Sequence, residues 1–406
     1  MVSRRRALER VAAVAGAVGL SGCQWLGSAG TGGVEGLPPN PRADALPVRQ
    51  FAQNDHLPTD DAGNTVQPRF RRVLALRLDV DPSAEAARTV ERAMRTVEAA
   101  YGWSARGLFH ALGWGTAYFE RVGALGRAPV TRPRVLSRTD DPELRAFDAV
   151  LVLASDVPSH LSAVDAAMFG SRSSLGGVAV DDRLGDAFAV ASRRTGFLGE
   201  GLPASHADTE GVPDAIPADA PMFTGFFSDR RGTQATEDAV AIADGPFEDG
   251  TTMHVSRLDL DLDAWYALSE SDRVARMFSP AVSSADVEGF ENAVPFADRV
   301  REHAREYGVV GHHEKVAQTR RDGTPLLLRR DFNTLDGGVP GVHFVSLQRR
   351  LSHFRETRKA MNGWYVRDDH PRITDRENNG LLGFVTVRSR ANFYVPPRDC
   401  RAFPLR

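Results

Sequence analysis

The chain has 406 residues, of which 42% are hydrophobic and 25% charged, and its 50 basic and 53 acidic side chains leave a formal net charge of −3 at pH 7. Beyond a short N-terminal extension, this length suits one large domain or two ordinary ones. The charges nearly balance and no basic stripe is present, so the sequence gives no support for a nucleic-acid partner.

The first 22 residues predict an export signal. Ser3 to Leu8 contains three consecutive arginines and resembles the twin-arginine motif, which a translocase for folded proteins recognises. The apolar stretch from Val11 to Leu20 is too short to cross a hydrocarbon core of roughly 30 Å. It stops at Gly22-Cys23, as in a lipobox, so we expect Cys23 to carry a lipid. An ordinary amphipathic helix would not explain that stop.

Residues 23–67 predict a tether or an ordered arm and not a core. They are rich in Gly, Pro, Asn and Asp and show no sustained apolar period. The globular part is expected to follow as an N-terminal ferredoxin-like domain over residues 68–200 and a C-terminal one over residues 201–406.

The N-terminal half predicts the order β-α-β…β-α-β of a ferredoxin-like unit. Alternation over residues 70–80 places Leu74, Leu76 and Leu78 on one strand face. Asp81-Pro82 then provides a helix start. Further strands are expected over 108–112, 147–154 and 187–195, with a helix over 159–169.

The C-terminal half repeats the pattern, and the fold class expected is therefore α+β. Two ferredoxin-like halves would form a dimeric α/β-barrel-like arrangement with a site between the layers. Segments 200–221 and 277–312 lack clear periodicity and are expected to be loops or short helices. The elements expected in this half are strands over 251–260, 325–332 and 341–347, a helix over 348–361, and a last strand or strand pair over 382–395.

Five segments of this half, in order, resemble the dye-decolourising peroxidases, which are haem enzymes built from two ferredoxin-like domains. The resemblance covers roughly residues 70–400, and Gly113-Trp114-Gly115 adds a less specific match in the first half. The five segments are Thr251 to Leu258 followed by Trp265, Gly311 to Lys315, Leu328 to Phe332, Gly341 to Arg349, and Phe393 to Pro397.

The resemblance implies that His313 binds the iron of haem b, because a basic residue follows it two positions later as in the family. His312 is the alternate ligand. Haem iron takes a neutral imidazole as its axial donor. A zinc site made of His312, His313 and Glu314 fits less well, since adjacent side chains rarely converge on one small ion. Phe344, on the penultimate strand, is implied to contact the cofactor.

On the opposite side of the haem the resemblance implies a distal arginine and a distal acid. Arg329 would stabilise charge on peroxide, with Arg330 on the other strand face. The family motif Gly-x-x-Asp-Gly corresponds here to Gly225 to Asp229, so Ser228 stands where the acid should be. A serine hydroxyl does not titrate near neutral pH and cannot replace the carboxylate. Asp229 and Asp331 are the remaining candidates for the proton-transfer role.

The sequence is compatible with three functions. The first is a haem-dependent, peroxidase-like oxidoreductase outside the cytoplasm, which reduces peroxide with electrons from an unknown donor. The second is a haem-binding protein for haem or iron handling or redox sensing that lacks the distal acid. The third keeps the fold without haem, because fold alone does not establish activity. The sequence leaves the oligomeric state open between a monomer and a homo-oligomer, and it predicts membrane attachment through Cys23.

Overall fold

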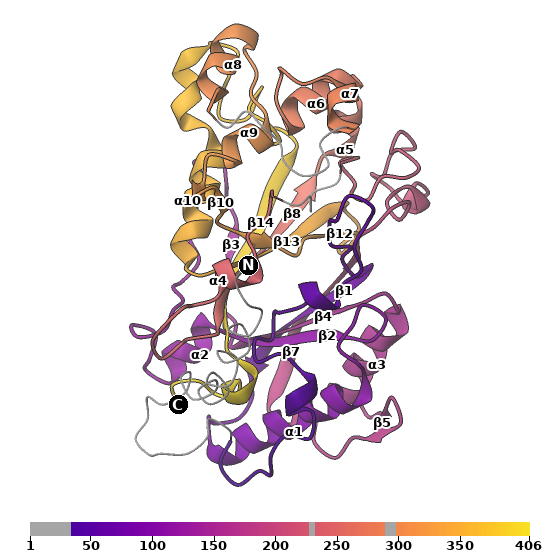
Figure 1. Cartoon of the computed structure of the whole chain (residues 1–406), viewed down its shortest axis with the longest axis vertical. Helices are drawn as coiled ribbons and strands as arrows, with labels where there is room; N and C mark the ends of the chain where they lie inside the picture. The colour runs from indigo at the N-terminus through magenta and orange to yellow at the C-terminus, as the bar shows by residue number, and fades with distance from the viewer. Residues whose placement is uncertain (1–33, 227–231, 289–297) are drawn as a thin grey trace, which may run out of the picture.

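The structure is a computed structural model, and it describes residues 34–226, 232–288 and 298–406 (Figure 1). The predicted signal and lipidation site, Cys23 included, lie outside these residues. No helix in the described ranges is both long and apolar enough to span a bilayer.

The first half forms a four-stranded antiparallel sheet in the order β7-β1-β4-β2, as a ferredoxin-like unit requires. Helix α1 begins after Ser83, whose side chain accepts a hydrogen bond from the Ala86 amide and so caps the helix. The main elements of this half are β1 (Phe70–Leu78), α1 (Ala84–Ala100), β2 (Phe109–Gly115), α2 (Thr116–Arg121), β4 (Ala149–Ser155), α3 (Pro158–Met168) and β7 (Phe188–Phe197), and the two-residue strands are β3 (Glu143–Leu144), β5 (Ser174–Leu175) and β6 (Val178–Ala179).

The second half repeats this sheet in the order β12-β13-β8-β14. Along the chain, short helices follow the first of these strands, β8, and one longer helix, α10, follows the third, β13. The elements are α4 (Glu237–Val240), β8 (Thr251–Leu260), α5 (Leu262–Tyr266), α6 (Glu270–Met277), α7 (Ser284–Glu288), α8 (Val300–Tyr307), α9 (His312–Val316), β11 (Leu328–Arg329), β12 (Phe332–Thr334), β13 (Gly341–Gln348), α10 (Leu351–Asn362) and β14 (Val385–Val395).

The two sheets join at two seams and close into a barrel of eight antiparallel strands within the described part of the chain. One seam pairs β7 with β12 at Phe197 and Asn333, and the other pairs β2 with β14. At the first seam a Cβ on Gly196 would lie 1.9 Å from the Asn333 carbonyl oxygen, so this approach requires glycine. The expected α+β fold of two ferredoxin-like halves is confirmed.

The strand alternation separates two cores. Leu74, Leu76 and Leu78 of β1 face the helices, where they pack with the α1 stripe that includes Val90 and Met94. Side chains on the other faces of the strands fill a second cluster that contains Phe332. Each fully buried side chain of this size stabilises the fold by roughly 1.5–3 kcal/mol.

One strand prediction was wrong. Residues 325–332 do not form a single strand but divide into Thr324–Pro325, β11 and the start of β12. The Arg330 amide still donates to the Val345 carbonyl at 2.8 Å, but the Val345 amide donates to the Asp331 side chain at 3.0 Å. A carboxylate thus takes the hydrogen bond that a continuous ladder would give to a main-chain carbonyl.

The described part of the predicted tether lies against the barrel. Gln50 is fully buried, and its side-chain amide donates to the carbonyls of Leu112 at 3.0 Å and Pro396 at 2.8 Å. Its carbonyl accepts from the Leu112 amide at 3.0 Å. This segment therefore spans the seam between β2 and β14 as an ordered arm.

Candidate functional site

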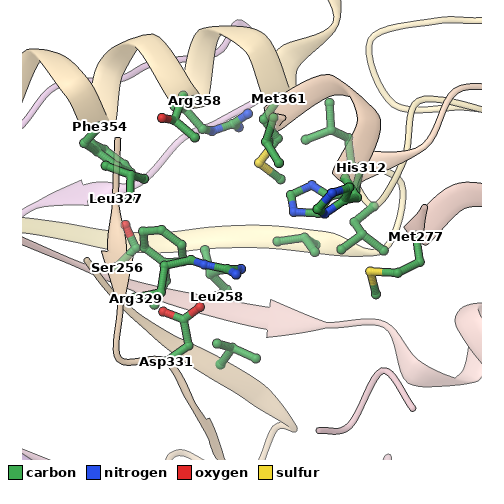
Figure 2. Close-up of a pocket in the computed structure, with 18 of the residues that line it drawn as sticks. Ser256, Leu258, Met277, His312, Leu327, Arg329, Asp331, Phe354, Arg358 and Met361 are labelled. Carbon is green, nitrogen blue, oxygen red and sulfur yellow. The ribbon is translucent and has the colours of Figure 1, made fainter. Parts of the chain in front are cut away.

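The site is a cavity of about 240 Å³ in the second half, between the sheet and helices α9 and α10. Figure 2 shows side chains from both layers directed into it. Its walls are mainly apolar, and the apolar side chains include Leu258, Met277, Leu327, Phe344, Phe354 and Met361. A cavity with apolar walls and a few polar groups is typical of a small-molecule or cofactor site.

Helix α9 brings both predicted histidines to this cavity, since His312 and His313 each line it. Burial, followed by the positive charges of Lys315 and Arg329, holds the pKa of His312 well below its usual range. This shift favours the neutral form of His312, and its buried Nδ1 has no hydrogen-bond partner within the described part of the chain. A neutral imidazole is the form that binds metal.

A buried carboxylate, that of Glu314, fixes the start of α9 through hydrogen bonds. Glu314 Oε1 accepts from the Gly311 amide at 2.6 Å, and Glu314 Oε2 accepts from His303 Nδ1 at 2.6 Å. Both side chains are fully buried, and Ser279 Oγ lies 3.0 Å from the same histidine nitrogen. Burial raises the pKa of Glu314, while these hydrogen bonds oppose that rise. The network sets the direction in which α9 presents its histidines.

Lys315, the basic residue in the predicted ligand motif, points away from the cavity. Its ammonium group is fully buried and donates to the main-chain carbonyls of Met361 at 2.8 Å and Asn379 at 3.0 Å. Burial, with a contribution from Arg358, lowers its pKa to about 7. Lys315 thus ties α9 to the end of α10.

Arg329 and Asp331 line the cavity from the sheet side, across from His312 (Figure 2). The Arg329 amide donates to Gln234 Oε1 at 2.7 Å. Asp331 is 6% exposed and holds the Val345 amide, as described above. Arg330 points elsewhere and donates to Asn54 Oδ1 at 2.9 Å and Glu237 Oε1 at 3.0 Å. The two arginines therefore point to different sides, although β11 ends at Arg329.

The other predicted site residues divide into two groups. Phe344 lines the cavity together with the histidines and Arg329. Ser228 and Asp229, the candidates from the Gly-x-x-Asp-Gly region, lie outside the described residues.

The sequence reasoning missed a charged cluster in the cavity wall. Arg358 Nη2 donates to both oxygens of Asp140, at 3.0 and 2.8 Å, and Arg390 Nη2 donates to Asp140 Oδ2 at 2.7 Å. The side chains of Arg358, Arg390 and Asp140 are 6%, 2% and 5% exposed, respectively, and all three line the cavity. They lie in three separate segments, so no local motif could have revealed them.

A polar chain behind the wall was also missed. Ser256, which lines the cavity, donates from Oγ to His254 Nε2 at 2.7 Å, and His254 Nδ1 donates to Asn392 Oδ1 at 2.7 Å. Asn392 Nδ2 donates to the Thr131 carbonyl at 2.8 Å, which fixes the amide orientation. Burial, followed by Arg390, lowers the pKa of His254 to about 3.

The comparisons place the sequence in a family. A family model described as "Family of unknown function (DUF7405)" matches residues 68–397, which is most of the chain. The chain belongs to this family. No curated protein matches it.

Solved structures show that this DUF7405 member has the fold of DyP-type peroxidases. A putative DyP-type peroxidase from Shewanella oneidensis is 14% identical, with 83% of this chain and 95% of that chain covered and a TM-score of 0.56. A DyP-type peroxidase from Cellulomonas bogoriensis is 19% identical, with coverage of 84% and 93% and a TM-score of 0.54. A variant of Rhodococcus jostii DypB in complex with heme is 16% identical, with coverage of 87% and 98% and a TM-score of 0.52.

The donor groups of the cavity fit a haem better than a bare ion. The described residues contain no group of three or more His, Cys, Asp or Glu side chains that could hold a metal. Haem brings four nitrogen donors of its own, so it requires one protein imidazole and apolar walls. The cavity of this DUF7405 chain supplies both, and the described residues leave the buried Nδ1 of His312 without a hydrogen-bond partner.

Proposed function

We propose that the protein binds haem b in this cavity and reduces peroxide outside the cytoplasm, with electrons from a donor that is not identified. The observation that carries the proposal is the arrangement of the cavity. His312 on α9 lies across the cavity from Arg329 and Asp331, and His313 also lines it, between mainly apolar walls. The DyP-type fold supports it, since a related structure binds heme.

Each side of the cavity has a separate role in this proposal. His313, or His312 as the alternate, holds the iron, and Phe344 packs against the cofactor. Bound haem would supply an iron that exchanges electrons with peroxide. The Arg329 guanidinium stabilises negative charge that develops on a peroxide oxygen. Asp331 or Asp229 accepts a proton from one peroxide oxygen and returns it to the other.

Haem titration of the purified protein tests the binding proposal. We expect wild-type protein to give a Soret band that saturates with haemin, and His313→Ala to lose or shift it. His312→Ala is the matched control one residue away. A band lost in His312→Ala and kept in His313→Ala would reverse the ligand assignment. The absence of a band in wild-type protein would refute haem binding and leave the fold without haem.

A haem-binding protein without peroxide turnover is the second candidate. Two observations favour it: Ser228 replaces the acid of the family motif, and Asp331 already accepts a main-chain hydrogen bond. Peroxide-dependent dye oxidation by the haem-loaded protein separates the two. Oxidation that exceeds free haemin and falls in Arg329→Leu supports the peroxidase, whereas a haem-loaded protein with no such activity supports the binding protein.

We also propose export by the twin-arginine route and attachment to the outer face of the cytoplasmic membrane through a lipid on Cys23. The support is the sequence of the first 23 residues. We expect Cys23→Ser to move the protein from the membrane fraction to the soluble exported fraction. Replacement of Arg4 and Arg5 by Lys should retain it inside the cell. Unchanged fractionation of both variants would refute the proposal.

A further inference from the structure

The cavity wall carries more positive than negative charge. Among the described residues, five arginines and two aspartates line it. Within the cluster described above, Arg358 and Arg390 share the single carboxylate of Asp140. Two buried cations held by one anion leave one positive charge without a counter-charge, which is costly in a site of low polarity.

Arg390 is the member of the cluster whose hydrogen bonds are least complete. Its Nη2 binds Asp140, but its Nε and Nη1 are buried and have no hydrogen-bond partner among the described residues. The guanidinium also lies over the Phe354 ring, 5.9 Å from its centroid, and Phe354 is a cavity residue. Because buried polar groups in folded proteins are almost always hydrogen-bonded, these two donors indicate a missing acceptor.

The neighbouring groups are affected by the same excess of positive charge. Burial, with a contribution from Arg358, lowers the pKa of Arg390 to about 10. Burial and then Arg390 lower the pKa of His254 to about 3. An anion bound at the cluster would oppose both shifts.

We infer that Arg390 and Arg358 form a subsite for a carboxylate group on the ligand of this cavity. A planar guanidinium matches a carboxylate in shape and forms charge-assisted hydrogen bonds with it. The remaining walls are mainly apolar, so the ligand is a largely apolar molecule that carries this acid. The source of the carboxylate rests on the proposed function: if the cavity binds haem, the carboxylate is one that haem carries. A carboxylated organic substrate is the other source of the same chemistry.

Arg390→Met is the informative variant because it leaves Asp140 balanced by Arg358 and removes a cation whose donors are incompletely bonded. We expect it to fold as stably as wild type, which urea unfolding checks. Arg388→Met is the matched control, since Arg388 lies two residues away on β14, is exposed and binds Asp259. It removes the same charge from the chain at a residue that does not line the cavity.

Two arms of one experiment test the subsite and separate the sources of the acid. The first compares the affinities of haemin and haemin dimethyl ester, whose acids are blocked. The second compares the rise in Tm of haem-free protein with millimolar benzoate and with benzamide. We expect wild type and Arg388→Met to prefer haemin over its ester by roughly tenfold to a hundredfold, and Arg390→Met to lose this preference. That result assigns the acid to haem.

A preference for benzoate that depends on Arg390, without a preference for haemin over its ester, would support the subsite and assign the acid to a separate small molecule. No preference for either carboxylate in wild type, or one that persists in Arg390→Met, would overturn the inference. If haemin does not bind at all, the proposed function fails, and the benzoate arm alone decides whether the subsite exists.

Discussion

Glu314 offers a direct test of how the structure fixes the candidate haem ligands. It is fully buried and accepts from the Gly311 amide and His303 Nδ1, each at 2.6 Å. Glu314→Ala removes both acceptors. The Gly311 amide then loses its hydrogen bond at the start of α9, whereas His303 keeps Ser279 nearby. We expect α9 to lose its fixed orientation and the protein to lose stability.

The magnitude follows from these contacts. A hydrogen bond to a charged group is worth roughly 1.5–3 kcal/mol, so two such bonds give about 3–6 kcal/mol. The burial of the carboxylate offsets part of this, because burial raises the Glu314 pKa and so disfavours its charged form. We therefore expect a loss of about 2–4 kcal/mol in the free energy of unfolding.

Urea unfolding followed by tryptophan fluorescence measures this loss, and haemin titration measures its consequence for the site. The control is Glu302→Ala on the neighbouring α8, because Glu302 forms an exposed ion pair with Arg299 at 2.6 Å. That variant should stay within about 0.5 kcal/mol of wild type. If Glu314→Ala is as stable as the control and binds haemin unchanged, the proposed support of α9 is wrong.

The other predictions concern acid stability and the distal side. Burial is the main cause that lowers the pKa values of His110 and His254 to about 3, so below pH 6.5 the unfolded chain takes up protons that the folded chain does not. These two histidines should lower the free energy of unfolding by about 3 kcal/mol between pH 6.5 and 5, because the slope for each rises from half of about 1.4 kcal/mol per pH unit at pH 6.5 to nearly all of it at pH 5; a flat profile in urea would contradict this. Arg329→Leu should lower peroxide turnover roughly 10²–10³-fold without loss of the Soret band, measured by dye oxidation. Ser228→Asp should raise turnover if the missing acid limits it, and an unchanged rate would exclude that explanation.

The fold could largely be predicted because its strands follow a simple alternation. The strand expected over 251–260 is β8 with the same bounds, and the one expected over 70–80 is β1. The strand over 325–332 was predicted wrongly because Asp331 binds a main-chain amide of β13. The alternation of apolar and polar residues cannot reveal that a side chain, and not a main-chain carbonyl, accepts a hydrogen bond from the neighbouring strand. The segment 277–312 was expected to hold loops or short helices; it contains α8, and α9 begins at its last residue, but the bounds of these helices could not be predicted without a clear periodicity.

The candidate site could be predicted only where its residues fall within short motifs. His312, His313 and Arg329 each belong to a segment that resembles a known family, and the structure brings all three to one cavity. Asp140 lies 218 residues from Arg358 and 250 from Arg390, so their contacts depend on closure of the barrel. No pattern of sequence spacing could have joined them.

Asp140 also links the architecture to the proposed export route. Asp140 and its neighbour Thr139 precede β4 of the first half, yet they line a cavity whose other described lining residues come from the second half. The cavity is therefore complete only after both halves have folded and the strand ring has closed. On the proposed function, a cofactor loaded in the cytoplasm would need this complete cavity before transport. A translocase that carries folded proteins meets that requirement, whereas threading an unfolded chain would dismantle the cavity.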